Sequence, residues 1–285
     1  TQWIFIQLFK SGLAYQKLAR VNWCPSCMTV LANEQVVDGK CDRCGSETTQ
    51  KEMKQWFFKI TDYTERLLSD LKGLNWPEAT VKRQKDWIGK SVGAMVKFPI
   101  KDSKSVIEVF TTRADTLFGG TFLILAPEHQ IIKDLESRIQ NFEEVKKYIK
   151  AASHKTELMR QEEAKDKTGV ELKGIKAINP ATKEEMPIWV ADFVLSGYGT
   201  GAVFADAHDE RDFEFAKKFG IRLKPTLKPE NGGNEEKIKN LETCFTGEGV
   251  LYDSAQFSGM KTAQAKAEIV KWLKSFGLAD FTINY

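Results

Sequence analysis

The most restrictive stretch of the sequence runs from Phe110 to His129, because it places polar side chains between two apolar runs. Three threonines, an arginine and an aspartate occupy residues 111–116, after a β-branched run and before the apolar run 122–125. A strand packed in a core does not need hydroxyls, a guanidinium and a carboxylate at its end. Such groups together can hold a polar substrate and a water molecule. The stretch therefore predicts a strand that delivers a binding site.

A second polar stretch, residues 197–212, reads Gly-Tyr-Gly-Thr-Gly-Ala-Val-Phe-Ala-Asp-Ala-His-Asp-Glu-Arg-Asp. It leads into an apolar-periodic segment that Gly220 ends, so a helix is predicted there. Asp209 and Asp212 stand three residues apart at its start. This spacing fits an N-cap with its capping-box partner and fits substrate recognition equally well. In either case we expect both carboxylates to stay ionised beside the positive helix end.

Together the two stretches closely resemble the editing domain of class I aminoacyl-tRNA synthetases in its leucyl form, whose first motif usually reads Thr-Thr-Arg-Pro-Asp-Thr-Leu-Phe-Gly. The resemblance implies a hydrolase that cleaves the ester of tRNA-Leu mischarged with isoleucine, norvaline or a similar amino acid, and that spares leucyl-tRNA. The parent enzyme would ligate leucine to tRNA-Leu with ATP and Mg²⁺. The His-x-Gly-His and Lys-Met-Ser-Lys-Ser signatures of that ligase site are absent from this sequence.

The resemblance also implies roles for individual residues. Hydroxyls of the first motif would orient the water and stabilise the transition state, its arginine would be held by a salt bridge to Asp115, and its last threonine would exclude leucine. The catalytic residues implied are Thr111, Thr112, Arg113 and Asp212. The substrate-binding residues implied are Thr116, Asp115, Asp209 and Tyr198. The implied partners are the tRNA-Leu 3′ end, misactivated amino acids and the rest of the synthetase chain.

Two departures from the family pattern affect the expected activity. Ala114 stands where proline is usual, which loosens the loop. The run from Phe204 to His208 is one residue shorter than the family's, with Asp206 in place of an apolar pair. Because this run helps to wall the amino-acid pocket, an alternative is a degenerate module that binds the tRNA 3′ end without hydrolysing it. No histidine stands in a recognisable nucleophile–base arrangement, and no catalytic metal is implied.

Two Cys-x-x-Cys pairs, separated by thirteen residues, predict a metal site at Cys24, Cys27, Cys41 and Cys44. Four thiolates in this pattern suit the tetrahedral coordination of Zn²⁺ at about 2.3 Å. Two disulfides are the alternative, which the two-residue spacing and a cytosolic context disfavour. Four sulfur ligands leave no open position, so the zinc is expected to be structural. For the fifth cysteine, Cys244, we expect a buried and inert thiol.

The charge balance excludes a strongly basic nucleic-acid-binding protein, since 42 basic and 39 acidic residues leave a net charge of +3 in 285 residues. No apolar run approaches the roughly eighteen residues of a membrane span, and no targeting segment opens the chain. We therefore expect a soluble, cytoplasmic protein. The chain begins without methionine, inside an amphipathic pattern, so we expect an excised fragment of a longer protein.

Strands and helices are intermixed without a regular βαβ rhythm, which predicts a compact α/β fold. We expect a mixed sheet or β-barrel-like core with flanking helices, plus a zinc-knuckle module. Helices are predicted within residues 2–18 and 50–72, and a hairpin within 93–110. For the aromatic residues of the second segment, the helical spacing favours a core-facing side over a base-stacking platform. The domains expected are a zinc-bearing segment of the catalytic or connective region at 1–91, the editing domain at 92–260, and a return segment at 261–285.

Overall fold

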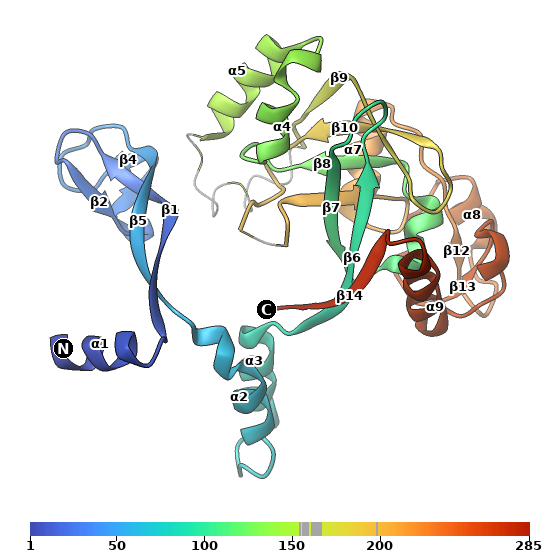
Figure 1. Cartoon of the computed structure of the whole chain (residues 1–285). Coiled ribbons are helices and arrows are strands. Elements are labelled where there is room, and N and C mark those ends of the chain that lie inside the picture. The colour runs from blue at the N-terminus through green and yellow to red at the C-terminus, as the bar shows by residue number, and fades with distance from the viewer. Residues whose placement is uncertain (154, 156–159, 161–166, 198) are drawn as a thin grey trace. The chain divides into compact units, whose positions relative to one another are not determined.

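The computed structural model describes every residue except 154, 156–159, 161–166 and 198 (Figure 1). It divides into two compact units. Unit 1 contains Thr1–Ser91, Ser153–Thr156 and Asn284–Tyr285, and unit 2 contains Val92–Ala152 and Glu157–Ile283. Within the described residues, no helix is both long and apolar enough to cross a membrane.

Unit 1 is built on a long antiparallel ribbon between β1 (Ala14–Cys24) and β5 (Thr49–Phe58). A short strand, β2 (Thr29–Leu31), pairs with the end of β1. The predicted helices at 2–18 and 50–72 are therefore only partly correct. The first, α1 (Gln2–Lys10), ends before Gly12, which has a φ of +74°.

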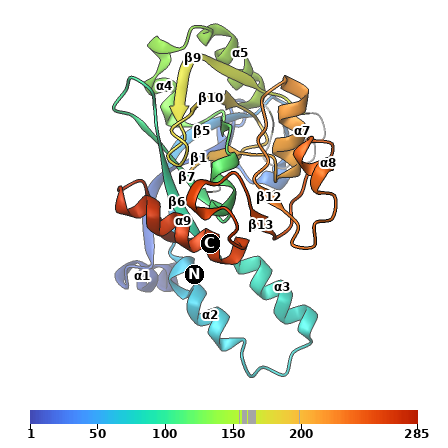
Figure 2. The same ribbon diagram turned by 90° about the vertical axis from the view of Figure 1, so that its right-hand side faces the viewer.

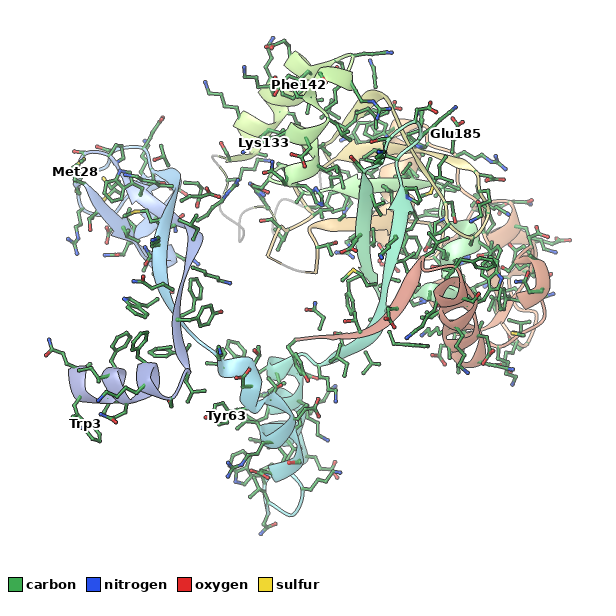
Figure 3. The ribbon with its side chains drawn as sticks, in the orientation of Figure 1. Trp3, Met28, Tyr63, Lys133, Phe142 and Glu185 are labelled. Carbon is green, nitrogen blue, oxygen red and sulfur yellow. The ribbon has the colours of Figure 1, made fainter. Side chains whose placement is uncertain are left out.

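The aromatic segment near Trp56 lies in the strand β5 instead of a helix, and the expected core-facing side is wrong. Trp56 and Phe58 are 47% and 50% exposed. Their rings contact Phe5 of α1, with centroids 4.8 and 6.3 Å apart. Neighbouring side chains of unit 1 are also exposed, among them the labelled Trp3 and Tyr63 (Figure 3).

The rest of unit 1 consists of short elements. A small hairpin carries the second cysteine pair, and two helices complete the unit. The elements, in order, are η1 (Asn33–Gln35), β3 (Val36–Val37), β4 (Lys40–Cys41), η2 (Ile60–Tyr63), α2 (Thr64–Asp70) and α3 (Glu78–Ile88).

Unit 2 contains a mixed four-stranded sheet with the strand order β11-β8-β10-β9, in which only the β8–β10 pair is parallel. A second sheet has the order β14-β6-β7 and includes the predicted hairpin. The described strands of unit 2 form separate sheets and no closed barrel. The strands are β6 (Ser91–Pro99), β7 (Val106–Thr111), β8 (Phe122–Leu125), β9 (Val170–Ile178), β10 (Glu185–Val190), β11 (Ala202–Ala205), β12 (Leu227–Lys228), β13 (Val250–Leu251) and β14 (Ala279–Asn284).

Helices cover these sheets, and the last of them supports the threonine-rich stretch. Residues 262–275 form α9, which lies against η3 and β13 (Figure 2). The rings of Phe118 and Trp272 stack with centroids 6.1 Å apart. The described helices of unit 2 are η3 (Ala114–Gly119), α4 (Gln130–Asp134), η4 (Glu136–Arg138), α5 (Phe142–Ser153), α7 (Glu210–Phe219), α8 (Glu235–Lys239), η6 (Ala255–Phe257) and α9 (Thr262–Ser275).

The turn η3, which follows the threonine pair, is buried along its whole length. The buried Asn179 packs against this turn and donates through Nδ2 to the carbonyls of Leu117 and Gly120 at 2.9 Å each. Gly119 allows the turn to approach Lys224, because a Cβ atom at residue 119 would stand 2.6 Å from the Lys224 carbonyl oxygen. The polar stretch is therefore fixed by packing on several sides.

Candidate functional site

A cavity of about 540 Å³ in unit 2 brings the two polar stretches together. Of the predicted site residues, six contribute to its lining: Thr111, Thr112, Arg113, Thr116, Asp209 and Asp212. Asp115 is not among the lining residues, because its carboxyl is fully buried behind them. Tyr198 lies outside the described residues. The lining also contains Asp206, His208 and Arg211, and an apolar wall that includes Phe110, Phe193, Val194, Leu195, Val203 and Phe204.

The guanidinium of Arg113 is anchored from two directions. Its Nε and one terminal nitrogen donate to the Asp115 carboxylate at 3.1 Å, and the other terminal nitrogen donates to the Thr246 carbonyl at 3.1 Å. This confirms the predicted salt bridge. Paired donors to one buried carboxylate fix both distance and orientation. Asp115 therefore acts on the cavity through Arg113.

Two threonine hydroxyls of the first stretch are fixed by hydrogen bonds to the backbone of Arg113. Thr111 Oγ1 accepts the Arg113 backbone N–H at 2.9 Å, which leaves its own O–H free to donate. Thr116 Oγ1 donates to the Arg113 carbonyl at 2.9 Å. Thr112 is exposed at the cavity edge. The stretch thus presents one fixed hydroxyl donor beside an anchored cation.

Asp209 is the N-cap of α7, as one interpretation of the sequence predicted. Its carboxylate accepts the backbone N–H groups of Arg211 at 2.9 Å and of Asp212 at 3.3 Å. Asp212 does not complete a capping box within the described residues. It is buried, it lines the cavity, and its carboxyl receives a hydrogen bond from the backbone of Asp206. The capping interpretation therefore explains Asp209 but leaves Asp212 available to a ligand.

The expectation that the helix end keeps Asp212 ionised requires correction. Burial raises the pKa of the Asp212 carboxyl well above its usual range, and the negative charges of Asp209 and Asp206 raise it further. The opposing effect of Arg211 is smaller. Desolvation and like charge therefore outweigh the partial positive charge of the helix N-terminus.

Asp206 was recognised in the sequence only as a departure from the family pattern. It follows β11 directly and is buried, and one carboxyl oxygen accepts the His208 backbone N–H at 2.6 Å. Burial raises its pKa to about 6. The acidic replacement in an apolar run was the available signal, but its burial in the cavity follows only from the tertiary structure.

His208 anchors the loop with both ring nitrogens. Nε2 accepts the backbone N–H groups of Thr226 at 2.8 Å and Leu227 at 3.0 Å, so Nδ1 carries the proton and donates to the Phe245 carbonyl at 2.9 Å. Burial lowers the pKa of the ring to about 4. The imidazole is therefore neutral and fully bonded near pH 7, which makes it a structural anchor and leaves it unable to serve as a base.

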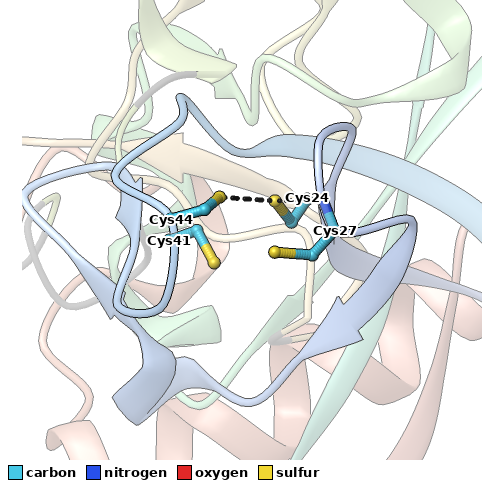
Figure 4. A group of neighbouring side chains, drawn as sticks. All are labelled: Cys24, Cys27, Cys41 and Cys44. Atoms are coloured by element: carbon cyan, nitrogen blue, oxygen red, sulfur yellow. Dashed lines mark hydrogen bonds between the residues drawn. The ribbon is translucent and has the colours of Figure 1, made fainter.

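The four predicted metal ligands also meet, in unit 1. Their Sγ atoms all lie within 4.8 Å of one another, and those of Cys24 and Cys44 are 3.4 Å apart (Figure 4). A tetrahedron of sulfurs about 2.3 Å from a central ion has edges of about 3.8 Å. No cysteine is in a disulfide. The cluster therefore fits a metal ion, and the disulfide alternative is not formed.

The fifth cysteine belongs to unit 2. Cys244 is half-buried rather than buried, and its thiol donates to the Ala207 carbonyl at 3.3 Å. Burial raises its pKa to about 12. The expectation of an inert thiol agrees with this environment, since the thiolate is the reactive form.

Replacing Asp206 by Asn should stabilise the chain more at neutral than at acidic pH. Because the folded-state pKa of about 6 exceeds the usual 3.8, the stabilisation from protonated Asp206 is complete below about pH 4 and is lost as pH rises through 6. Asn keeps an oxygen for the His208 N–H and does not ionise. The variant should gain about 2 kcal/mol relative to wild type between pH 4.5 and 7.5.

Urea unfolding of both chains at the two pH values measures this change. His208 has an opposite dependence, because its lowered pKa removes stability as pH falls from about 6.5 to about 4. Both chains contain His208, so its contribution cancels in the difference. A wild-type-to-variant difference that stays constant with pH would contradict the assignment.

Two known sequence families match this chain. The family described as "Leucyl-tRNA synthetase, editing domain" matches residues 85–274, and the family "tRNA synthetases class I (I, L, M and V)" matches residues 1–92. Curated leucine–tRNA ligases of Clostridium perfringens strain 13, Petrotoga mobilis and Caldanaerobacter subterraneus are 49%, 48% and 50% identical over the whole chain. The chain spans 34% of the length of each.

A solved structure is similar over the whole chain as well. It is the agnB2 LeuRS of Agrobacterium radiobacter K84 in a ternary complex described as LeuRS-tRNA-LeuAMS, with a TM-score of 0.73 and 32% sequence identity. The match covers all of this chain and 32% of that one. Both polar stretches of the cavity fall inside residues 85–274. This chain belongs to the family of leucyl-tRNA synthetase editing domains.

Proposed function

We propose that the cavity hydrolyses the ester of mischarged tRNA-Leu and spares leucyl-tRNA. The relatives are longer proteins. In a full-length protein of this kind, a separate catalytic domain would ligate leucine to tRNA-Leu with ATP and Mg²⁺. The observation that carries the proposal is the meeting, in one cavity, of the buried carboxyl of Asp212, the fixed hydroxyl of Thr111 and an apolar wall.

A second hydrolytic site is needed because binding alone discriminates poorly between aliphatic side chains. One methylene contributes only about 1–3 kcal/mol to selectivity. A mischarged ester presents an α-ammonium, an aliphatic side chain and a carbonyl that becomes an oxyanion. The cavity offers carboxyls for the ammonium, apolar residues such as Phe193 and Val194 for the side chain, and the Thr111 hydroxyl for the oxyanion or the water.

The proposed reaction is attack by an oriented water on the ester carbonyl carbon. A tetrahedral intermediate forms, the bond between that carbon and the ribose oxygen breaks, and the ribose oxygen takes the proton that the attacking water gives up. Thr111 and Thr112 would hold the water or the developing oxyanion, and Arg113 would position them. Asp212 would bind the ammonium, whose charge favours the ionised carboxylate that burial disfavours.

Two further contacts belong to the proposal. Thr116 is 1% exposed, and its hydroxyl is held by the Arg113 carbonyl, so its side chain is fixed in the cavity lining. We assign it the exclusion of the leucine side chain. Asp209 supports Asp212 as the cap of α7, and Tyr198 is a proposed substrate contact outside the described residues.

The tRNA partner is proposed from the relatives. The similar LeuRS structure is described as a complex with tRNA and LeuAMS. A degenerate module that binds the tRNA 3′ end without hydrolysis is the second candidate, and the observation that favours it is the buried Asp206 in the shortened pocket run. Only the hydrolase would cleave a mischarged ester, so a deacylation assay distinguishes the two candidates.

Asp212→Asn should lower kcat/KM for deacylation of norvalyl- or isoleucyl-tRNA-Leu by about 100-fold, because a charge-assisted contact to the ammonium is lost. Wild type should leave leucyl-tRNA-Leu intact. Glu210→Gln is a matched control, because Glu210 is exposed on the same helix and does not line the cavity. Release of the amino acid is followed with radiolabelled ester, in this chain and in the full-length protein.

A variant that deacylates like wild type would remove Asp212 from the mechanism. Binding of the tRNA 3′ end by both proteins with no hydrolysis in either would overturn the hydrolase and support the binding module.

We also propose that Cys24, Cys27, Cys41 and Cys44 hold a structural Zn²⁺. The support is the sulfur cluster, together with a backbone N–H of Cys27 that donates to Cys24 Sγ at 3.2 Å and so orients that ligand. Zinc bound by four thiolates would cross-link the two turns of unit 1 and would have no position for a reacting water. It would contribute to folding and not to hydrolysis.

Purified chain should contain one zinc ion, and Cys24→Ser should lose it, because a buried ligand is removed. Atomic absorption measures the metal, and deacylation reports on unit 2. Cys244→Ser is the control and should keep its zinc. Full zinc content in the Cys24→Ser chain would contradict the assignment, as would zinc loss in the control.

A further inference from the structure

Asp206 has more capacity to accept hydrogen bonds than the protein uses. An ionised carboxylate offers about four acceptor positions. One is taken by the His208 backbone N–H at 2.6 Å. The Thr116 hydroxyl lies close enough to occupy a second position, although its single proton is directed to the Arg113 carbonyl at 2.9 Å. About two positions therefore remain for a group inside the cavity.

Within the described residues neither Asp206 nor Asp212 forms an ion pair with a cation. Arg113, whose charge lowers the pKa of Asp206, is committed to Asp115 and to the Thr246 carbonyl. The cavity thus contains two buried carboxyls whose oxygens can accept more hydrogen bonds than the protein donates to them. An α-amino ester brings a single ammonium, which the proposed function assigns to Asp212.

We propose that Asp206 recognises the side chain of the bound amino acid, so that the cavity favours a side chain carrying a hydroxyl donor over an aliphatic one of the same size. This inference rests on the proposed function of the cavity. A site that hydrogen-bonds a substrate hydroxyl rejects the analogue without it, because the protein group is then left buried and unpaired.

The position of Asp206 favours the side chain over the ammonium. Its carboxyl lies beside Thr116, the residue assigned to limit the side chain, and Asp206 lies two residues beyond Phe204, part of the apolar wall. Asp212 instead stands on the first turn of α7, where Asp209 caps the helix. At pH 7.5 Asp206 is ionised and can accept a hydroxyl, since its pKa is about 6.

Threonine and valine provide a matched pair of ligands, because they differ by a hydroxyl in place of a methyl group. Their non-hydrolysable 3′-aminoacylamino-adenosine amides keep the ammonium, side chain and ribose, so binding is measured without turnover. By calorimetry at pH 7.5, wild type should bind the threonyl amide about 10- to 100-fold more tightly than the valyl amide. Asp206→Val should abolish this ratio, and Asp206→Asn, which keeps an oxygen for His208, should reduce it.

Asp212→Asn is the companion variant and should weaken both amides equally, since both carry the ammonium. Equal affinities of wild type for the two amides would overturn the inference. It would also be overturned if the Asp206 variants weakened both amides alike, because Asp206 would then share the ammonium. Deacylation of threonyl- and valyl-tRNA-Leu tests hydrolysis separately, so loss of turnover with the binding ratio retained would reject the hydrolase and not the recognition by Asp206.

Discussion

The cavity depends on two buried carboxyls that have no ion-pair partner within the described residues. Removing an ionised carboxylate from water is costly, and the protein gives Asp212 and Asp206 only partial compensation, through backbone N–H groups and the charges of Arg211 and Arg113 respectively. This incomplete compensation raises the pKa of both carboxyls. A ligand with an ammonium or hydroxyl donor supplies what is missing, so the same feature that costs stability in the free protein favours binding of an amino acid.

Such a site persists only where the surrounding structure holds it in place, and here the anchors come from distant parts of the chain. His208 ties the second stretch to residues 226, 227 and 245, while Asn179 ties the first to β9 and the turn beyond it. Arg113 is fixed by Asp115 and by the Thr246 carbonyl. Each anchor satisfies a polar group in the interior, so irregular backbone around the cavity is held by specific hydrogen bonds.

Local patterns explain what the sequence could predict. The four cysteines, the strand before Thr111, the Asp209 cap and the end of α7 at Gly220 depend on short spacings and were confirmed. The roles of Asn179 and His208 depend on partners remote in sequence, and the pKa of Asp212 depends on burial, which no local pattern reveals. The ribbon β1–β5 was mistaken in part for helix, because a few closely spaced aromatic residues fit either period.

The most direct measurement is the number of protons exchanged when the cavity binds an ammonium. The norvalyl amide of 3′-amino-3′-deoxyadenosine and its counterpart without the amino group are titrated by calorimetry at pH 6.5, in two buffers of different ionisation enthalpy. If the buried carboxyls lack a neutralising cation in the free protein, binding of the ammonium lowers their pKa. Protons are then released with the norvalyl amide and not with its counterpart. Equal proton exchange with both ligands, or none with either, would contradict that account of the cavity.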